Sequence, residues 1–344
     1  LFRSTRDGTV AVGGEDGVVR LWKPGAPATV LDRAFTAREM VLSADDRYLV
    51  WSRGPTQGGV RLADLGVADH PRFELEGCGR YPRFAASVAR FACVRNFDGA
   101  TLLWNTETWT PITVDTAGPV QVDSMSISAD GTQVVSGRLE EGADFRLWDT
   151  RSGAARILSR IHGNVVASAF RPGGDDVITG DLARRVRWFR LSDGTSALLG
   201  QEGAAISQVV AGTRFIAVGK ADGMVGIWDV ERGMTMHVRP PRTNAGQIVD
   251  LRLTADETML VALHKRGQVV IWDIASGVGL PLPGNVGAIG LSSDGRLLAL
   301  GDDGGNVWRV TMPSPTAGAR GEGEWTPFEP AWKPLAPVTP PSPT

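Results

Sequence analysis

Four histidines are the residues of this chain best suited to metal binding or base catalysis. His70, His162, His237 and His264 are far apart in the sequence, and no two of them have the spacing of paired metal ligands. Motifs for a serine nucleophile (Gly-x-Ser-x-Gly) or a phosphate-binding loop (Gly-x-x-x-x-Gly-Lys) do not occur. The sequence therefore predicts no catalytic residue, no cofactor and no metal site.

Neighbouring carboxylates are the other groups with potential acid–base chemistry. They occur at Asp45–Asp46, Glu140–Glu141, Asp175–Asp176 and Asp302–Asp303. Each pair falls in a predicted turn, where carboxylates are usually solvated, whereas catalysis needs two groups held across a pocket with different pKa values. A site assembled from several parts of the chain would not form a linear motif, so an enzyme stays open as the alternative function.

The two cysteines, Cys78 and Cys93, are predicted to be small buried thiols. Neither belongs to a Cys-x-x-Cys pair, and two cysteines in 344 residues do not make a disulfide framework. This usage favours a reducing compartment, and we expect a cytoplasmic location.

Composition limits the classes of partner. Hydrophobic residues make up 42% of the chain and the formal net charge is −2, which suits a folded core but not a globally basic nucleic-acid binder. No apolar run approaches the length of a membrane span, so no membrane partner is expected. The first residue is Leu1, not Met, and we expect the chain to be one module of a larger protein.

Two landmarks repeat along the chain. The first is a polar turn followed by apolar residues, as in SADDRYLV from Ser43, SADGTQVV from Ser128 and SSDGRLLAL from Ser292; eight copies are spaced by 38 to 44 residues. The second is a short strand that ends in an aromatic residue, as in DGMVGIWDV from Asp222, and it follows each turn in register. Such periodicity is typical of a repeat architecture.

Each repeat predicts a small sheet of four strands, because Val, Ile, Leu and Trp fill the strand positions and Gly, Asp and Ser fill the turns. A single four-stranded sheet cannot bury both of its apolar faces. Sheets arranged radially bury each face against a neighbour and leave only short edges. The sequence therefore predicts an all-β propeller of eight four-stranded blades.

The repeats resemble the WD-repeat β-propellers over roughly residues 1 to 312. Trp-Asp itself occurs at Trp148–Asp149, Trp228–Asp229 and Trp272–Asp273. Departures at the same position are Trp22–Lys23, Trp104–Asn105, Trp308–Arg309, Phe189 and Ala63. The resemblance implies structural roles for Trp22, Trp104, Trp148, Trp228 and Trp272, and for His162, which could join Thr179 in a partial hydrogen-bond network.

Aspartates six residues before the tryptophan occur at Asp16, Asp98, Asp222 and Asp302. Their expected role is also structural, because a carboxylate in a tight turn accepts backbone N–H groups.

The eight repeats place the propeller at residues 1–330. The segment GEWTPFE from Gly323 is expected to supply the outer strand of the eighth blade, and residues 331–344 are expected to form a proline-rich tail. The alternative is a ring of seven blades plus an extra unit.

The resemblance implies a protein-interaction role. We expect a non-catalytic scaffold or sensor module, C-terminal to an effector domain of a bacterial protein. The alternative is a quinoprotein-like enzyme with a central-channel site. The expected partner is another protein or an acidic peptide, ahead of nucleic acid. Loops on one face of the resembled fold would gather the partner-binding residues Phe35, Arg53, Tyr81, Arg95, Phe97, Arg138, Arg184, Arg185, Lys220, Lys265 and Arg266.

Overall fold

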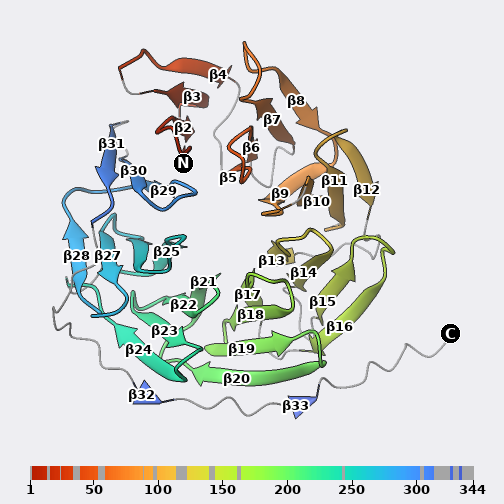
Figure 1. The fold of residues 1–344 in the computed structure, drawn as a ribbon, viewed down its shortest axis with the longest axis vertical. Helices are drawn as coiled ribbons and strands as arrows, with labels where there is room; N and C mark the ends of the chain where they lie inside the picture. The colour runs from red at the N-terminus through yellow and green to blue at the C-terminus, as the bar shows by residue number, and fades with distance from the viewer. Residues whose placement is uncertain are drawn as a thin grey trace.

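Eight small antiparallel sheets form a ring in the computed structural model of this chain (Figure 1). The structure describes residues 2–13, 16–23, 25–33, 39–52, 59–87, 89–95, 99–113, 122–138, 144–160, 164–241, 245–302, 306–313, 326–327 and 333–334. The eight-bladed propeller predicted from the two repeated landmarks is confirmed, and the alternative of seven blades plus an extra unit is wrong.

Blades 1 to 8 follow the chain, and within each blade the strands pair in sequence order. Blades 1 to 4 contain β1 (Phe2–Ser4), β2 (Val10–Gly13), β3 (Val18–Trp22), β4 (Thr29–Arg33); β5 (Glu39–Leu42), β6 (Tyr48–Ser52), β7 (Val60–Asp64), β8 (Arg72–Leu75); β9 (Cys78–Phe84), β10 (Arg90–Arg95), β11 (Thr101–Asn105), β12 (Thr110–Thr113); and β13 (Val122–Ile127), β14 (Gln133–Arg138), β15 (Asp144–Asp149), β16 (Ala155–Arg160).

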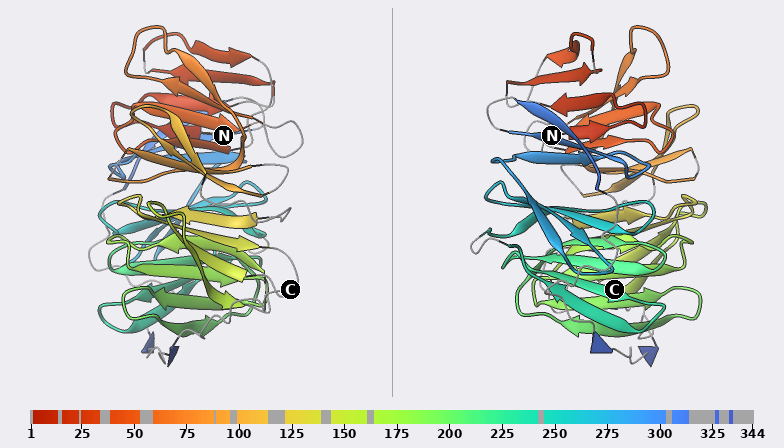
Figure 2. Two further views of the ribbon diagram at one scale, coloured as in Figure 1. Left: turned by 90° about the vertical axis from the view of Figure 1, so that its right-hand side faces the viewer. Right: turned by 60° about the vertical axis from the view of Figure 1, so that its left-hand side comes forward.

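Blades 5 to 8 contain β17 (Val165–Phe170), β18 (Asp176–Asp181), β19 (Arg185–Arg190), β20 (Thr195–Gln201); β21 (Ile206–Ala211), β22 (Phe215–Lys220), β23 (Val225–Asp229), β24 (Met234–Val238); β25 (Ile248–Leu253), β26 (Met259–His264), β27 (Val269–Asp273), β28 (Gly279–Leu282); and β29 (Ala288–Leu291), β30 (Leu297–Gly301), β31 (Val307–Thr311). The first strand of each blade is innermost (Figure 1). Figure 2 shows the ring from the side, with loops gathered on two opposite faces.

A Ser-x-Asp or Thr-x-Asp turn joins the first and second strands of several blades. In blade 4 the Ser128 hydroxyl donates to Asp130 Oδ1 at 2.6 Å, and the same oxygen accepts the Thr132 N–H at 3.1 Å. Gly131 takes a φ of 65°, which glycine adopts at little cost. The turn is therefore held by hydrogen bonds among its own residues, which explains why it is the clearest repeat in the sequence.

The hydrophobic core is divided among the spaces between blades. Between blades 6 and 7, for example, Val225 and Met236 pack with Ile248 and Trp272 in one buried cluster. Each blade therefore contributes one face to each of two cores, as the radial arrangement requires.

The C-terminal segment does not supply the eighth blade's outer strand. Thr326–Pro327 (β32) pairs with β24 of blade 6, and Lys333–Pro334 (β33) pairs with β20 of blade 5. The two short strands lie along the outside of the ring (Figure 1). The role predicted for GEWTPFE is thus wrong, because its described residues extend another blade, and the described part of blade 8 has three strands.

Trp308 does not occupy the repeated tryptophan position of blade 8. It lies opposite Leu300, whereas Val310 lies opposite Leu298, the place that Trp272 takes opposite Leu260 in blade 7. Trp308 is 43% exposed. The predicted alignment of this repeat is wrong by two residues, because a conspicuous tryptophan was matched without regard to the strand register.

Cys78 and Cys93 form a disulfide, with 5.7 Å between their Cα atoms. The prediction of two free thiols is therefore wrong. The residues lie on the neighbouring strands β9 and β10, whose pairing contains irregular register shifts. Counting cysteines does not reveal that one hairpin brings both side chains together.

No helix among the described residues is long and apolar enough to span a membrane.

Candidate interaction face and central channel

The turns between second and third strands lie on one face of the ring, which we call the top face. In blades 5, 6 and 7 each such turn is tied to the loop that enters the same blade. The N–H groups of Leu182, Ala221 and Lys265 donate to the carbonyls of Asn164, Ala205 and Gln247 at 3.1, 2.9 and 2.8 Å. Three neighbouring blades thus hold these turns in fixed positions on a rigid frame.

Four exposed side chains on these turns form what we call the top patch: Leu182, Arg184, Lys265 and Arg266. Leu182 is 51% exposed and lies in the same turn of blade 5 as Arg184, whereas Lys265 and Arg266 lie in the equivalent turn of blade 7. Arg184 has a backbone φ of 69°, a conformation that residues other than glycine rarely adopt. Arginine is enriched at protein interfaces, and Leu182 adds apolar area in the same turn as Arg184.

Other predicted partner residues are held inside the structure. Lys220 is only 2% exposed and its ammonium contacts Glu202 Oε2 at 2.8 Å, so it is not available to a partner. Arg185 is partly buried and contacts Asp181 Oδ2 at 2.7 Å. Tyr81 lies on the inner strand β9 and lines the central channel, not the top face. These corrections arise because sequence position gives a strand end but not the direction of its side chain.

The remaining predicted partner residues divide into two groups. Arg95 ends β10 and is partly buried, and Arg138 ends β14 at the equivalent place. Phe35, Arg53 and Phe97 lie outside the described residues.

A buried cluster of charges lies below the top face at the boundary of blades 5 and 6. Glu202 accepts from Lys220 and lies 3.1 Å from Nε2 of His237. Burial alone would raise the pKa of Glu202, but hydrogen bonds from His237 and Lys220 hold that pKa below its usual value. The carboxylate is thus kept ionised, and its partners satisfy it structurally.

His264 takes the place of Lys220 in blade 7. Its Nε2 lies 3.1 Å from the Gly223 carbonyl of blade 6 and its Nδ1 lies 3.2 Å from the Gln268 carbonyl. Burial lowers the pKa of His264, while the two carbonyls oppose that effect. The contact with Gly223 joins the turns of two adjacent blades.

The predicted structural tryptophans line the boundaries between blades. Trp104, Trp148, Trp228 and Trp272 are all buried, and Trp22 is partly buried. Trp148 Nε1 donates to Ser136 Oγ at 3.1 Å, which is one part of the network that the resemblance implies. His162 lies outside the described residues.

The turn aspartates accept backbone N–H groups. Asp16 Oδ1 accepts from Val18 at 3.1 Å, and Asp222 Oδ1 accepts from Met224 at 3.0 Å. A hydrogen bond from Arg20 is the main reason that the pKa of Asp16 is lowered. Asp98 lies outside the described residues.

The inner strands of all eight blades line a central channel of about 770 Å³. The charged residues in its described lining are Arg3, Glu39, Asp46, Arg83, Asp250 and Arg252. Sequence reasoning missed these residues, although the three arginines each stand two residues before an inner turn. Among the described residues, no group of three or more His, Cys, Asp or Glu side chains is placed to hold a metal ion.

Comparisons with known proteins agree with this architecture. Residues 185–316 match the family model of the Vps8 beta-propeller. Telomerase protein component 1 of Mus musculus is 25% identical over 273 residues, which is 76% of this chain and 10% of that protein. This chain thus spans about a tenth of that relative's length.

Among solved structures, the computationally designed Ika8 protein superposes with a TM-score of 0.71 at 18% identity, covering 90% of this chain and 95% of that one. This likeness concerns the fold. Together the comparisons support a β-propeller fold, with similarity to the Vps8 beta-propeller over residues 185–316.

Proposed function

We propose that this chain is a non-catalytic interaction propeller that binds another protein through the top patch, as a scaffold or sensor module of a larger protein. The observation that carries the proposal is the exposed Leu182 in the same turn as Arg184, together with the exposed Lys265 and Arg266 in the equivalent turn of blade 7. Backbone hydrogen bonds fix both turns. Preorganised loops lose little conformational freedom on binding.

The chemistry of the top patch favours an acidic partner. Arg184, Lys265 and Arg266 attract carboxylates, and arginine binds them with two parallel hydrogen bonds. Leu182 offers apolar area that a partner can cover. A protein or acidic peptide is favoured over nucleic acid because the chain as a whole has a net charge of −2.

Charge reversal on the two faces tests the proposal. The variant Arg184→Glu/Lys265→Glu changes the top patch, and the control Arg151→Glu/Arg232→Glu makes the same charge change at exposed turns between third and fourth strands on the other face. We expect the unmodified chain and the control to capture the same proteins in similar amounts. The top-patch variant should capture at least tenfold less of them. Equal capture by all three folded proteins would contradict the proposal.

A second variant separates apolar contact from charge. Leu182→Ser removes the exposed leucine without changing any charge, and because Leu182 is exposed the substitution should not affect folding. Capture should fall for this variant as well. Unchanged capture would show that Leu182 is not part of the interface.

A further inference from the structure

Three arginines lie at the same level of the central channel, although they belong to blades 1, 3 and 7. Arg3, Arg83 and Arg252 each stand two residues before the inner turn, where hydrogen bonds close the hairpin. Across their hairpins they lie opposite Ala11, Ala92 and Val261. Because the inner strands run side by side around the channel, the equivalent positions form one layer. We call it the arginine layer.

The acidic groups of the channel lie at other positions. Glu39 and Asp250 are two residues nearer the top face than the arginine layer, opposite Ser52 and Leu263. Asp250 contacts Arg252 at 2.8 Å, and Glu39 accepts the Tyr81 N–H at 2.7 Å.

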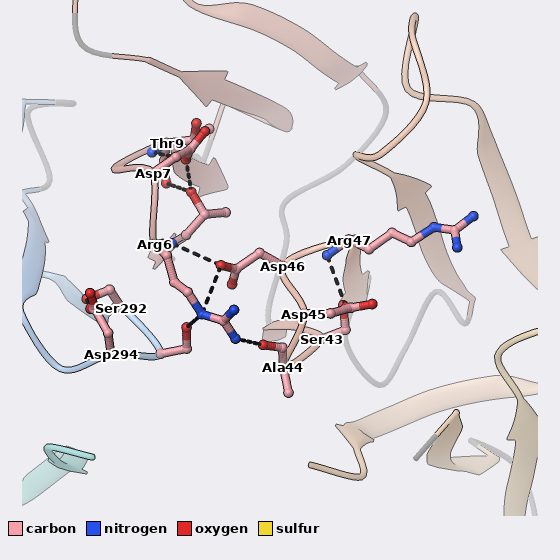
Figure 3. A network of polar contacts seen from close by, with 12 residues as sticks. Arg6, Asp7, Thr9, Ser43, Ala44, Asp45, Asp46, Arg47, Ser292 and Asp294 are labelled. Carbon is pink, nitrogen blue, oxygen red and sulfur yellow. Dashed lines mark hydrogen bonds and ion pairs between the residues drawn. The ribbon is translucent and has the colours of Figure 1, made fainter. Parts of the chain in front are cut away.

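The third acidic residue, Asp46, makes its hydrogen bond outside the arginine layer. It accepts the Arg6 N–H at 3.0 Å on the turn of blade 2 (Figure 3). Within the described lining, three guanidinium groups are therefore accompanied by two carboxylates in the channel itself.

The arginines influence one another inside the ring. Burial, followed by the positive charge of Arg252, lowers the pKa of Arg3 to about 9. Burial also lowers the pKa of Arg83, and Arg252 again adds to the effect. The layer therefore gathers three guanidinium groups in a confined space. Charges surrounded by protein are costly unless an opposite charge accompanies them.

Blade 5, which faces blade 1 across the ring, contributes a polar but uncharged group to the channel. Ser168 on β17 of blade 5 lines the channel, and its Oγ has no hydrogen-bond partner. A hydroxyl group can donate to an oxyanion without adding charge. The channel thus combines guanidinium groups from blades 1, 3 and 7 with a hydroxyl group from blade 5, within a volume typical of small-molecule sites.

We propose that the central channel binds a small molecule that carries phosphate or carboxylate groups, seated against Arg3, Arg83 and Arg252. Guanidinium groups recognise both kinds of oxyanion with two parallel hydrogen bonds. The site is separate from the top patch and does not depend on the function proposed for that patch.

Calorimetric titration with pyrophosphate and with citrate at low ionic strength tests the site and shows which oxyanion it prefers. We expect binding to the unmodified protein and at least tenfold weaker binding to Arg83→Gln/Arg252→Gln. The control Arg151→Gln/Arg232→Gln removes the same number of arginines from the outer surface and should bind as the unmodified protein does. The top-patch variant should also retain binding.

Absence of binding to the unmodified protein, or an equal loss in the control, would overturn the proposal. If the channel variant does not fold, crystals of the unmodified protein soaked in tungstate provide a second measurement. Anion density against the arginine layer would support the site. A channel without such density would overturn it.

Discussion

The boundaries between blades are filled by different residues in two regions of the ring, blades 5 to 7 and the seam formed by blades 8, 1 and 2. In blades 6 and 7, Trp228 and Trp272 are each 1% exposed and fill the boundary with the preceding blade. In blade 2 the equivalent position is Ala63, and in blade 8 it is Val310. The comparison teaches that the ring tolerates loss of the repeated tryptophan where other residues fill the space.

Blade 2 compensates by moving its tryptophan to the neighbouring strand. Trp51 on β6 is fully buried in the same cluster as Ala63, and its Nε1 donates to Asp32 of blade 1 at 3.2 Å. Asp32 also contacts Arg61 at 2.6 Å. A large ring therefore still joins blades 1 and 2, although it comes from the second strand instead of the third.

The seam is also fastened by polar contacts on the face opposite the top patch. Arg6 of blade 1 donates to the Ala44 carbonyl of blade 2 and, at 2.9 Å, to Ser293 Oγ of blade 8 (Figure 3). Its guanidinium also lies 3.7 Å from Asp46. One side chain thus connects the first blade to both of its neighbours.

Tryptophan truncation should give the largest difference between the two regions. Trp228→Ala should lower the free energy of unfolding by about 3–5 kcal/mol, because it leaves a cavity between blades. Trp308→Ala should lower it by about 1 kcal/mol or less, because the residue is 43% exposed and its removal leaves no enclosed cavity. Urea denaturation of both variants measures the contrast, and equal losses would contradict it.

Disruption of the buried charge cluster of blade 6 should give the second-largest loss in the free energy of unfolding. Glu202→Gln leaves Lys220 buried without its carboxylate, and we expect a loss of about 3 kcal/mol. The paired variant Lys220→Met/Glu202→Leu removes both charges and should recover most of that loss. Denaturation of the two proteins provides the test, and a paired variant less stable than the single one would refute this account of the cluster.

The polar contacts of Arg6 at the seam should contribute less to the free energy of unfolding. Arg6→Ala should cost at most about 1 kcal/mol, because the side chain is more than half exposed and its ion pair is screened by solvent. The matched control is Arg190→Ala, which removes an exposed ion pair within blade 5 alone. Thermal melts should show a larger decrease for Arg6→Ala. A decrease no larger than the control's would mean that Arg6 does not hold the seam.

The turn aspartates should give the smallest single effects, with a defined pH dependence. A hydrogen bond from Ser292 is the main reason that the pKa of Asp294 is lowered. Since its pKa is lower in the folded state, its contribution is present above the unfolded pKa of about 4 and is lost as the pH falls through the folded value.

Asp294→Asn should therefore cost less than about 0.5 kcal/mol at neutral pH. The difference from the unmodified protein should shrink when the melts are repeated near pH 3. A difference that grows in acid would have the wrong sign.

The sequence predicts the ring but not its exceptions. Turns such as Ser128–Asp130 form from local hydrogen bonds, so their repeat reveals eight blades. Three exceptions depend on contacts between strands. They are the use of Trp51 on β6 where blade 2 has Ala63 at the repeated tryptophan position, the disulfide between Cys78 and Cys93, and the pairing of Thr326–Pro327 with blade 6. Local pattern carries no information about such contacts.

The sequence likewise predicts only part of each candidate site. The cations of the top patch were found because strand ends are visible in the repeat. The burial of Lys220 was missed because its partner Glu202 lies in a loop with no motif. The arginine layer had a visible signal in its constant distance from the inner turn, but that signal acquires meaning only once the strands surround a channel.

Hydrogen–deuterium exchange of the propeller, alone and with the main protein it captures, tests the interaction face most directly. The account predicts that binding slows exchange at the turns 182–184, 221–224 and 265–268 of the top face. Exchange at the turns containing Arg151 and Arg232 should not change. Protection of those opposite turns, with no change on the top face, would contradict the proposed function.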